Sequence, residues 1–347
     1  MLIAVPGISC ALTIDPADRA SESTTELYTS LDVRGYSESV PVADMVQGWD
    51  GPFQSGRYAL GDVRLVTGAR WQSWFVERES RWHYDLRFSS GMSRYYYALE
   101  QGRALASTEA LQLDVRSVEA WGVRLGRAIE HTAASGKWRL TPALAVYRAG
   151  HFQYGQLSGT AEQGSDSQAS AELEYHYDDD KILEHDPFVP KGWGVSLDIT
   201  AAWQGEHWQA DVRIQDAINR WQWNDAAFTT ACININDPQQ SICTSSGTAS
   251  GRSGQDVLVA RLRPTTSARL VQSQWQTEAS LDLHDRFERL GLHQFFLQGQ
   301  AGVSVHTTRQ LGVHWRSGWL TLDWLSDDLR LSYARDLDIR ARVNLQW

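Results

Sequence analysis

The sequence lacks long hydrophobic runs, and none of its 347 residues belongs to a stretch of 18 or more consecutive apolar residues. A membrane protein built from helices needs such stretches, so the sequence excludes that class. Lysine is also scarce, because Lys137, Lys181 and Lys191 are the only lysines among 32 basic residues, and the formal net charge is -10. An acidic chain without a basic stripe is not expected to bind nucleic acid.

Cysteine is rare as well, with three residues in the chain. Cys10 lies in the apolar stretch 1–14, which resembles the core of a secretory signal peptide and turns polar at Asp15. We therefore predict that residues 1–20 are a signal peptide or a disordered N-terminal segment. Residues 21–347 are predicted to form one domain.

The two remaining cysteines lie close together in the sequence. Cys232 and Cys243 are separated by ten residues, in a segment rich in Ser, Thr, Gly and Asn. In an exported chain this arrangement predicts a local disulfide. Closing a loop of this size would contribute about 3 kcal/mol in the chain-entropy model.

Tryptophan, in contrast, is abundant. The chain contains 16 Trp residues, and aromatic residues make up 11 % of it. The mean hydropathy is nevertheless mildly negative, at -0.40. A transmembrane β-barrel combines these properties, because only alternate residues of each strand face lipid while Trp and Tyr gather at both membrane interfaces.

The distribution of apolar residues along the chain supports this interpretation. Apolar and polar residues alternate with period two in most segments, most clearly over 329–347, and helical spacing is nearly absent. A soluble β-sandwich also alternates. The segments here are long, however, with aromatic residues near their ends and charges along the opposite face. The sequence therefore predicts an all-β fold, a transmembrane antiparallel up-and-down β-barrel.

The last segment resembles the closing strand of bacterial outer-membrane β-barrel proteins. Leu337, Ile339, Ala341, Val343 and Leu345 alternate with polar residues, and the chain ends in an aromatic residue, Trp347. Proteins of that class end in an aromatic residue, more often Phe, that the barrel-assembly machinery reads. The resemblance implies the outer membrane of a Gram-negative bacterium, with lipid, lipopolysaccharide and that machinery as partners. It identifies no functional family.

The pattern allows two numbers of strands. Single-chain bacterial barrels have even numbers of strands, and both chain ends should lie at the periplasmic end while the segment 224–255 is extracellular. Thirteen segments alternate, which is an odd number, and these conditions place the miscounted segment before residue 224, in 150–193. We therefore predict 12 strands, with 14 as the alternative. Thirteen alternating segments can be counted, at about 25–36, 57–76, 81–94, 109–127, 137–149, 167–178, 193–203, 207–223, 256–264, 268–284, 293–306, 309–325 and 329–347.

The polar faces of these segments carry charges of both signs. They are expected to line a channel that selects solutes, or to pair with one another and fill the lumen. The residues predicted to line the lumen are Asp62, Arg64, Arg70, His83, Asp85, Arg87, Asp114, Arg116, Arg124, Asp211, Arg213, Asp282, His284, Asp338, Arg340 and Arg342.

Several tryptophans fall on the apolar faces, many near the ends of segments. We predict that these are membrane-interface anchors. They include Trp71, Trp82, Trp138, Trp203, Trp208 and Trp347. Trp49, Trp221 and Trp223 lie in or beside predicted loops and are exceptions to this interpretation.

We interpret the sequence as a narrow channel for small solutes with a charged Arg/Asp lumen. One alternative is a non-conducting barrel that anchors or assists an envelope secretion, pilus or polysaccharide assembly through a partner protein. Another is an outer-membrane hydrolase, since His83 with Asp85 and Asp282 with His284 place an imidazole beside a carboxylate. No nucleophile motif accompanies these pairs, so we predict no catalytic residue, no metal site and no cofactor. The acidic segment 174–186 is expected to be a solvated turn.

Overall fold

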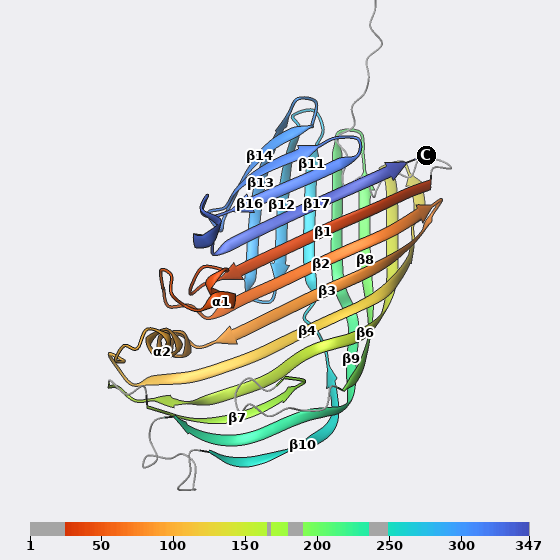
Figure 1. Cartoon of the computed structure of the whole chain (residues 1–347). Helices are drawn as coiled ribbons and strands as arrows, with labels where there is room; N and C mark the ends of the chain where they lie inside the picture. The colour runs from red at the N-terminus through yellow and green to blue at the C-terminus, as the bar shows by residue number, and fades with distance from the viewer. Residues whose placement is uncertain (1–24, 165–167, 180–189, 236–248, 347) are drawn as a thin grey trace, which may run out of the picture.

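The chain forms a single antiparallel sheet that closes on itself. The computed structural model describes residues 25–164, 168–179, 190–235 and 249–346. Closure comes from pairing of the first strand, β1 (Thr25–Ser37), with the last, β17 (Asp336–Gln346) (Figure 1). The strands between them are β2 (Tyr58–Trp71), β3 (Trp74–Phe88), β4 (Glu109–Arg127), β5 (Ile129–Ala133), β6 (Gly136–Ala161), β7 (Ala169–Tyr177), β8 (Lys191–Gln204), β9 (Trp208–Ile235), β10 (Ala249–Ala260), β11 (Thr265–Gln272), β12 (Thr277–His284), β13 (Phe287–Phe296), β14 (Ala301–His306), β15 (Leu311–Arg316) and β16 (Leu320–Ser326).

These segments make up a barrel of 14 strands, so the prediction of 12 was wrong. Three barrel strands consist of two segments each. β4 and β5 both pair with β6, and β7 and β8 lie end to end between β6 and β9. β10 and β11 likewise both pair with β9.

The thirteen counted segments differ from the fourteen barrel strands in two ways, and the second explains the wrong prediction of 12. The segments 167–178 and 193–203 were counted as two strands, whereas β7 and β8 occupy one position in the barrel. The segments 293–306 and 309–325 were each counted as one strand but contain a hairpin. The turn inside 293–306 hardly interrupts the alternation, because it includes Gln298, which adopts a positive φ angle that is rare for non-glycine residues.

A similar turn changes which face of β3 points inward. Gln72, with φ 53°, begins a two-residue turn that pairs Trp71 directly with Trp74. The prediction had carried one strand through to residue 76, which would place Phe75 on the apolar outer face with Trp71. In the structure Phe75 is buried and Trp74 is exposed, because the turn moves the alternation by one residue.

Short helices replace predicted strand at two places on the barrel end opposite the chain termini. β3 ends at Phe88, and α2 (Ser90–Glu100) follows, with the Ser89 hydroxyl accepting a hydrogen bond from the Met92 N–H at 3.0 Å. The segment 329–335 contains the 3-10 helix η2 (Leu331–Tyr333), so the closing strand begins only at Asp336. A further short helix among the described residues is α1 (Asp44–Gln47). No helix in the described ranges is long and apolar enough to cross a membrane.

The barrel wall is uneven in height. β6 has 26 residues and β9 has 28, whereas β14 and β15 have six each. The long strands form one tall, curved wall that extends beyond the short strands at the end carrying α1 and α2 (Figure 1). The predicted loop 224–255 is correspondingly shorter, because β9 continues to Ile235 and β10 begins at Ala249.

Large apolar side chains cover much of the outer surface of the barrel. They are more than a third exposed, far beyond the scattered apolar residues that a soluble monomer displays. Examples from strands around the whole barrel are Leu65, Val123, Leu144, Val146, Val259, Leu290, Leu292, Val303, Val305, Leu311, Val313 and Leu345. An apolar outer band with a charged interior is the architecture of bacterial outer-membrane barrels, as the closing segment predicted.

Two tryptophans predicted to be exceptions are packed inside the barrel. Trp221 and Trp223 are both fully buried, and Trp221 lies directly opposite Gly194 in the pairing of β8 with β9. Trp221 stacks on Tyr147 with ring centroids 5.1 Å apart, and Trp223 stacks on Phe152 at 4.6 Å. The indole rings occupy space that a side chain on the opposite strand would otherwise fill.

This packing makes a prediction for Gly194. A Cβ atom added at Gly194 would overlap the indole ring of Trp221. Gly194→Ala should therefore lower the free energy of unfolding by about 1–3 kcal/mol, the usual cost of overpacking. Urea unfolding followed by Trp fluorescence measures the change. Gly318→Ala is the control, because nothing lies within 4 Å of its added Cβ, and an equal loss in both variants would contradict the prediction.

Candidate functional site

Two cavities lie inside the barrel among the residues that the structure describes. The proximal cavity, of about 270 Å³, lies toward the chain termini, since residues of the β2–β3 turn such as Gln72 and Ser73 line it. The distal cavity, of about 760 Å³, lies against the tall wall and is lined by residues of β4, β6, β7, β9 and β10, together with Arg87 and Arg286.

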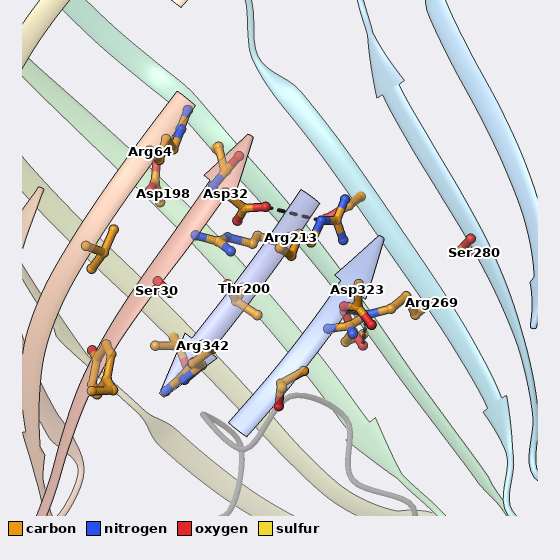
Figure 2. Close-up of a pocket in the computed structure, with 18 of the residues that line it drawn as sticks. Ser30, Asp32, Arg64, Asp198, Thr200, Arg213, Arg269, Ser280, Asp323 and Arg342 are labelled. Carbon is orange, nitrogen blue, oxygen red and sulfur yellow. Dashed lines mark hydrogen bonds and ion pairs between the residues drawn. The ribbon is translucent and has the colours of Figure 1, made fainter. Parts of the chain in front are cut away.

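Arginine dominates the lining of the proximal cavity. Ten arginines and seven carboxylates line it, a formal excess of three positive charges. Figure 2 shows how Arg64, Arg213, Arg269 and Arg342 project from strands on different sides of this space. The arginines are Arg64, Arg70, Arg124, Arg139, Arg213, Arg269, Arg289, Arg316, Arg340 and Arg342, and the acidic residues are Asp32, Glu77, Asp198, Asp211, Glu278, Asp282 and Asp323.

Between the cavities lies a set of buried charged and imidazole side chains, which we call the charge layer. It comprises Arg64, Arg81, His83, Asp85, Asp216, Arg263 and His284. Residues of this layer reach both cavities: Arg64 lines the proximal cavity, while Arg263 contacts Asp114 of the distal cavity at 3.3 Å. The layer therefore contacts the lining of both cavities.

Asp216 is the centre of the layer on the proximal side. It accepts hydrogen bonds from Arg81 at 2.8 and 3.0 Å, from Arg64 at 3.3 Å and from the Ser196 hydroxyl at 2.7 Å. Its own backbone N–H donates to Asp198 at 2.8 Å. Arg81 and Asp216 are both buried, and the strands that carry them, β3 and β9, are not neighbours in the sheet. This bidentate pair therefore spans the interior.

A positive φ angle explains why Asp216 can occupy this position. Asp216 has φ 56°, and the pairing of β8 with β9 shifts register between Leu197 and Ile199, opposite this segment. The irregularity is a local bulge, and aspartate tolerates the left-handed conformation better than most residues. Simple alternation along β9 does not predict such a bulge.

Arg263 is the centre of the layer on the distal side. It lies in the connection between β10 and β11 and donates to Asp85 of β3 at 2.5 Å. It also lies 3.4 Å from Asp285, which pairs with Arg87. β3 and β12 are separated around the wall by five barrel strands in one direction and seven in the other. Contacts from β3 to the ends of β10 and β12 therefore cross the lumen.

Two histidines complete the layer. His83 of β3 and His284 of β12 face each other across the lumen, with ring centroids 5.5 Å apart. His83 is hydrogen-bonded through Nδ1 to Asp62 at 2.8 Å, and His284 through Nδ1 to the Thr265 hydroxyl at 2.8 Å.

Further ion pairs fasten the short-stranded side of the barrel. Arg289 donates to both Asp282 and Asp338 at 2.7 Å, and Arg34 lies 3.4 Å from Asp282. Arg340 also donates to Asp338, at 3.0 Å. These groups lie on β1, β12, β13 and β17, so charge pairing links adjacent and non-adjacent strands near the closure.

A hydrogen-bonded chain of histidines lies beside this network. His293 bonds the Ser280 hydroxyl at 2.8 Å through Nε2 and His314 at 3.2 Å through Nδ1. His314 in turn bonds Asp323 at 2.7 Å. The chain lines the proximal cavity, and each ring nitrogen of His293 and His314 has a partner.

The sixteen predicted lumen residues fall into two groups. Arg64, Arg70, Arg124, Asp211, Arg213, Asp282, Arg340 and Arg342 line the proximal cavity. The other eight take part in ion pairs or ring contacts inside the barrel or at its distal end: Asp62, His83, Asp85, Arg87, Asp114, Arg116, His284 and Asp338. The structure thus brings together positions that the sequence could assign only to a common face.

Several residues of the charged interior were missed. Glu77 and Glu79 fell where a turn was predicted, because the true β2–β3 turn lies several residues earlier, and Arg81 began the predicted segment 81–94 but was left out of the lumen residues. Asp216 lies at a bulge and Arg263 between two strand segments, so neither follows the alternation. For Arg81 a usable signal existed, since Trp74 and Val76 alternate with Phe75 and Glu77 once the turn is placed at Gln72.

Most of the predicted interface tryptophans lie on the outer surface. Trp71, Trp82, Trp138 and Trp208 are 36–48 % exposed, and Trp203 packs beside Trp138 with ring centroids 6.1 Å apart. Trp347 lies outside the described residues.

Other predictions also fall partly outside the described residues. Cys232 lies on β9 and lines the distal cavity, but Cys243 lies outside these residues, so the disulfide stays a prediction. The same holds for the signal peptide at 1–20 and for the part of the acidic segment beyond residue 179.

Comparisons with known proteins give only distant likenesses. No protein-family model matches the sequence, and no curated protein is significantly similar to it. Among solved structures, the chain is similar to the TodX monoaromatic hydrocarbon channel, in a deltaS2 mutant, with 10 % identity and a TM-score of 0.23, over 94 % of this chain and 90 % of that chain. It is similar to the FrpB iron transporter from Neisseria meningitidis with 8 % identity and a TM-score of 0.20, over 94 % and 82 %. It is similar to OccAB2 of Acinetobacter baumannii with 8 % identity and a TM-score of 0.17, over 94 % of this chain and 98 % of that chain. Values this low say nothing about what passes through the present barrel.

Proposed function

We propose that this chain is a narrow channel of the bacterial outer membrane, that it passes small anionic solutes, and that the charge layer restricts its opening. The observation that carries the proposal is the arrangement of two cavities on either side of that layer inside a closed barrel. A lumen lined by rings of charged side chains selects solutes by charge.

The outer surface supports a membrane-spanning orientation. Trp138 pairs with Trp203 near the end that carries the termini, and Arg148, ten residues further along β6, pairs with Trp121 and Trp193. Ten residues of strand span about 33 Å, or about 25 Å along the membrane normal at a tilt of about 40°. These two levels of tryptophan match the separation of the aromatic girdles that flank an outer-membrane band.

The charge of the proximal cavity supports the choice of anions. Arginines exceed carboxylates in its lining by three, although the whole chain has a net charge of -10. Positive charge is therefore concentrated in the lining of the proximal cavity. Arginine also binds carboxylate and phosphate groups in a bidentate manner, so a small organic anion suits this cavity.

Single-channel recording in planar bilayers tests the proposal. The folded protein, reconstituted under a KCl gradient, is expected to conduct in small steps with a reversal potential of the sign that anion selectivity produces. Boiled, unfolded protein is the control. A protein that is folded, as judged by its heat-modifiable mobility in gels, and yet never conducts would refute the channel, and cation selectivity would refute the choice of solute.

One observation favours a second candidate, a non-conducting barrel that anchors an envelope assembly. The charge layer consists of buried pairs that satisfy one another, which is also how a permanently filled lumen is built. In that case the tall wall around the distal cavity is the surface for a partner. Absence of conductance together with stoichiometric co-purification of one envelope protein would support this candidate.

A further inference from the structure

We infer that His83, Asp85 and His284 form a binding site for one divalent transition-metal ion at the centre of the charge layer. One nitrogen or oxygen atom from each residue lies within 4.8 Å of the others, and all three residues are buried. Two come from β3 and one from β12, so the site joins opposite sides of the lumen. The inference is independent of conduction and holds for either proposed function.

Unpartnered atoms mark the place of the ion. Nε2 of His83, Nε2 of His284 and Oδ1 of Asp85 are buried and have no hydrogen-bond partner in the described part of the chain. The three residues are only 2 %, 1 % and 0 % exposed. A buried polar atom without a partner carries a considerable energetic cost, so three in one place call for a ligand that they share.

The surroundings orient both imidazoles, and for His83 they also fix the form that binds a metal. Asp62 accepts from Nδ1 of His83 at 2.8 Å, and the Thr265 hydroxyl contacts Nδ1 of His284 at 2.8 Å. Because the Asp62 carboxylate only accepts, the proton of His83 lies on Nδ1 and the lone pair of its Nε2 is available. His284 presents the same lone pair when its Nδ1 donates to the Thr265 hydroxyl. A carboxylate or hydroxyl behind a metal-binding histidine is the usual outer partner that fixes ring orientation and tautomer.

Asp85 can bind the ion without losing its own anchor. Its Oδ2 accepts from Arg263 at 2.5 Å, while Oδ1 remains free. Arg263 thus holds the carboxylate in place from the side away from Oδ1. Its charge is shared with Asp114 and Asp285, at 3.3 and 3.4 Å.

The donor set indicates which kind of ion fits. Two imidazole nitrogens and one carboxylate oxygen suit Zn²⁺ and similar borderline ions, which accept three protein ligands and a water molecule. Ca²⁺ and Mg²⁺ prefer sites made entirely of oxygen ligands. The nearby histidine chain is a weaker candidate, because the ring nitrogens of His293 and His314 already have partners.

Titration with Co²⁺ tests the site, because its visible absorption reports coordination directly. The full-length folded protein in detergent, stripped of metal with a chelator, should bind one Co²⁺ per chain, and Zn²⁺ should displace it. His83→Ala and His284→Ala should each weaken binding by more than about 100-fold. His293→Ala is the matched control, a buried lumen histidine outside the site, and it should bind Co²⁺ as the parent protein does.

Three results of the titration would contradict the proposed site. No Co²⁺ binding by the parent protein, unchanged binding in both site variants, or loss of binding in His293→Ala would each overturn the inference. X-ray absorption spectroscopy of the Zn²⁺-loaded parent protein requires no variant to fold. It should show two imidazoles and a carboxylate oxygen at about 2.0–2.2 Å. A spectrum with three imidazoles, or with none, would overturn the assignment.

Discussion

Replacing Asp216 with alanine is expected to lower the free energy of unfolding by about 3–5 kcal/mol, the cost of leaving a buried charge without its partner. Arg81 would lose both of its hydrogen bonds to the carboxylate while remaining only 1 % exposed. Arg64 would lose one partner, and the Ser196 hydroxyl would lose its acceptor. Few other single substitutions in the barrel would disturb so many buried polar groups.

Urea unfolding in lipid vesicles, followed by tryptophan fluorescence, measures this loss. Glu130→Gln is the matched control, because Glu130 also accepts from an arginine, Arg139, but is 54 % exposed in its side chain. Exposed pairs contribute about 0–1 kcal/mol, so the control should unfold almost as the parent protein does. If Asp216→Ala lowered the free energy of unfolding no more than the control did, the predicted contribution of the buried pair would be wrong. Asp216→Asn should fall between them, since it keeps the shape but not the charge.

Replacing Arg263 with alanine is expected to raise single-channel conductance several-fold and to shift selectivity toward cations. Arg263 is the side chain that reaches from the β10–β11 connection to Asp85, Asp114 and Asp285. Its removal opens space between the two cavities and leaves carboxylates facing that space. Both changes follow from the size and charge of the narrowest part of a pore.

The comparison is best made under one salt gradient in planar bilayers, with conductance and reversal potential recorded together. Arg252→Ala is the control, because Arg252 is an exposed arginine of β10 that lies over the Phe228 ring, away from the charge layer. The parent protein and this control should behave alike. If Arg263→Ala matched them in both measurements, the charge layer would not be the restriction.

The local chemistry of the sequence was sufficient to predict the type of fold. Period-two alternation, such as Leu337 to Leu345 against Asp338 to Arg342, specifies strands with one apolar and one charged face. This pattern needs no tertiary information, because the side-chain direction in a strand has a period of two residues. The closed barrel with an apolar exterior confirms that prediction.

The number of strands depended on features that leave little trace in the sequence. Gln72 and Gln298 turn the chain with positive φ angles, although neither is a glycine or an asparagine, and the turn at Gln298 hid one hairpin. Neighbouring strands impose these turns, because the register of the sheet fixes where each strand must reverse. The same reason explains how β7 and β8 share one position in the barrel despite the interruption between them.

The sequence alone therefore determined which side chains share a face of a strand. Only the tertiary structure decided which of them meet across the lumen. His83 and Asp85 are neighbours on β3 by alternation, but His284 and Arg263 reach them only because the barrel closes with β3 opposite β12. Asp216 joins Arg81 through a bulge in β9 that alternation does not anticipate. Alternation is a property of one strand, whereas contacts across a barrel depend on strand number, register and closure together.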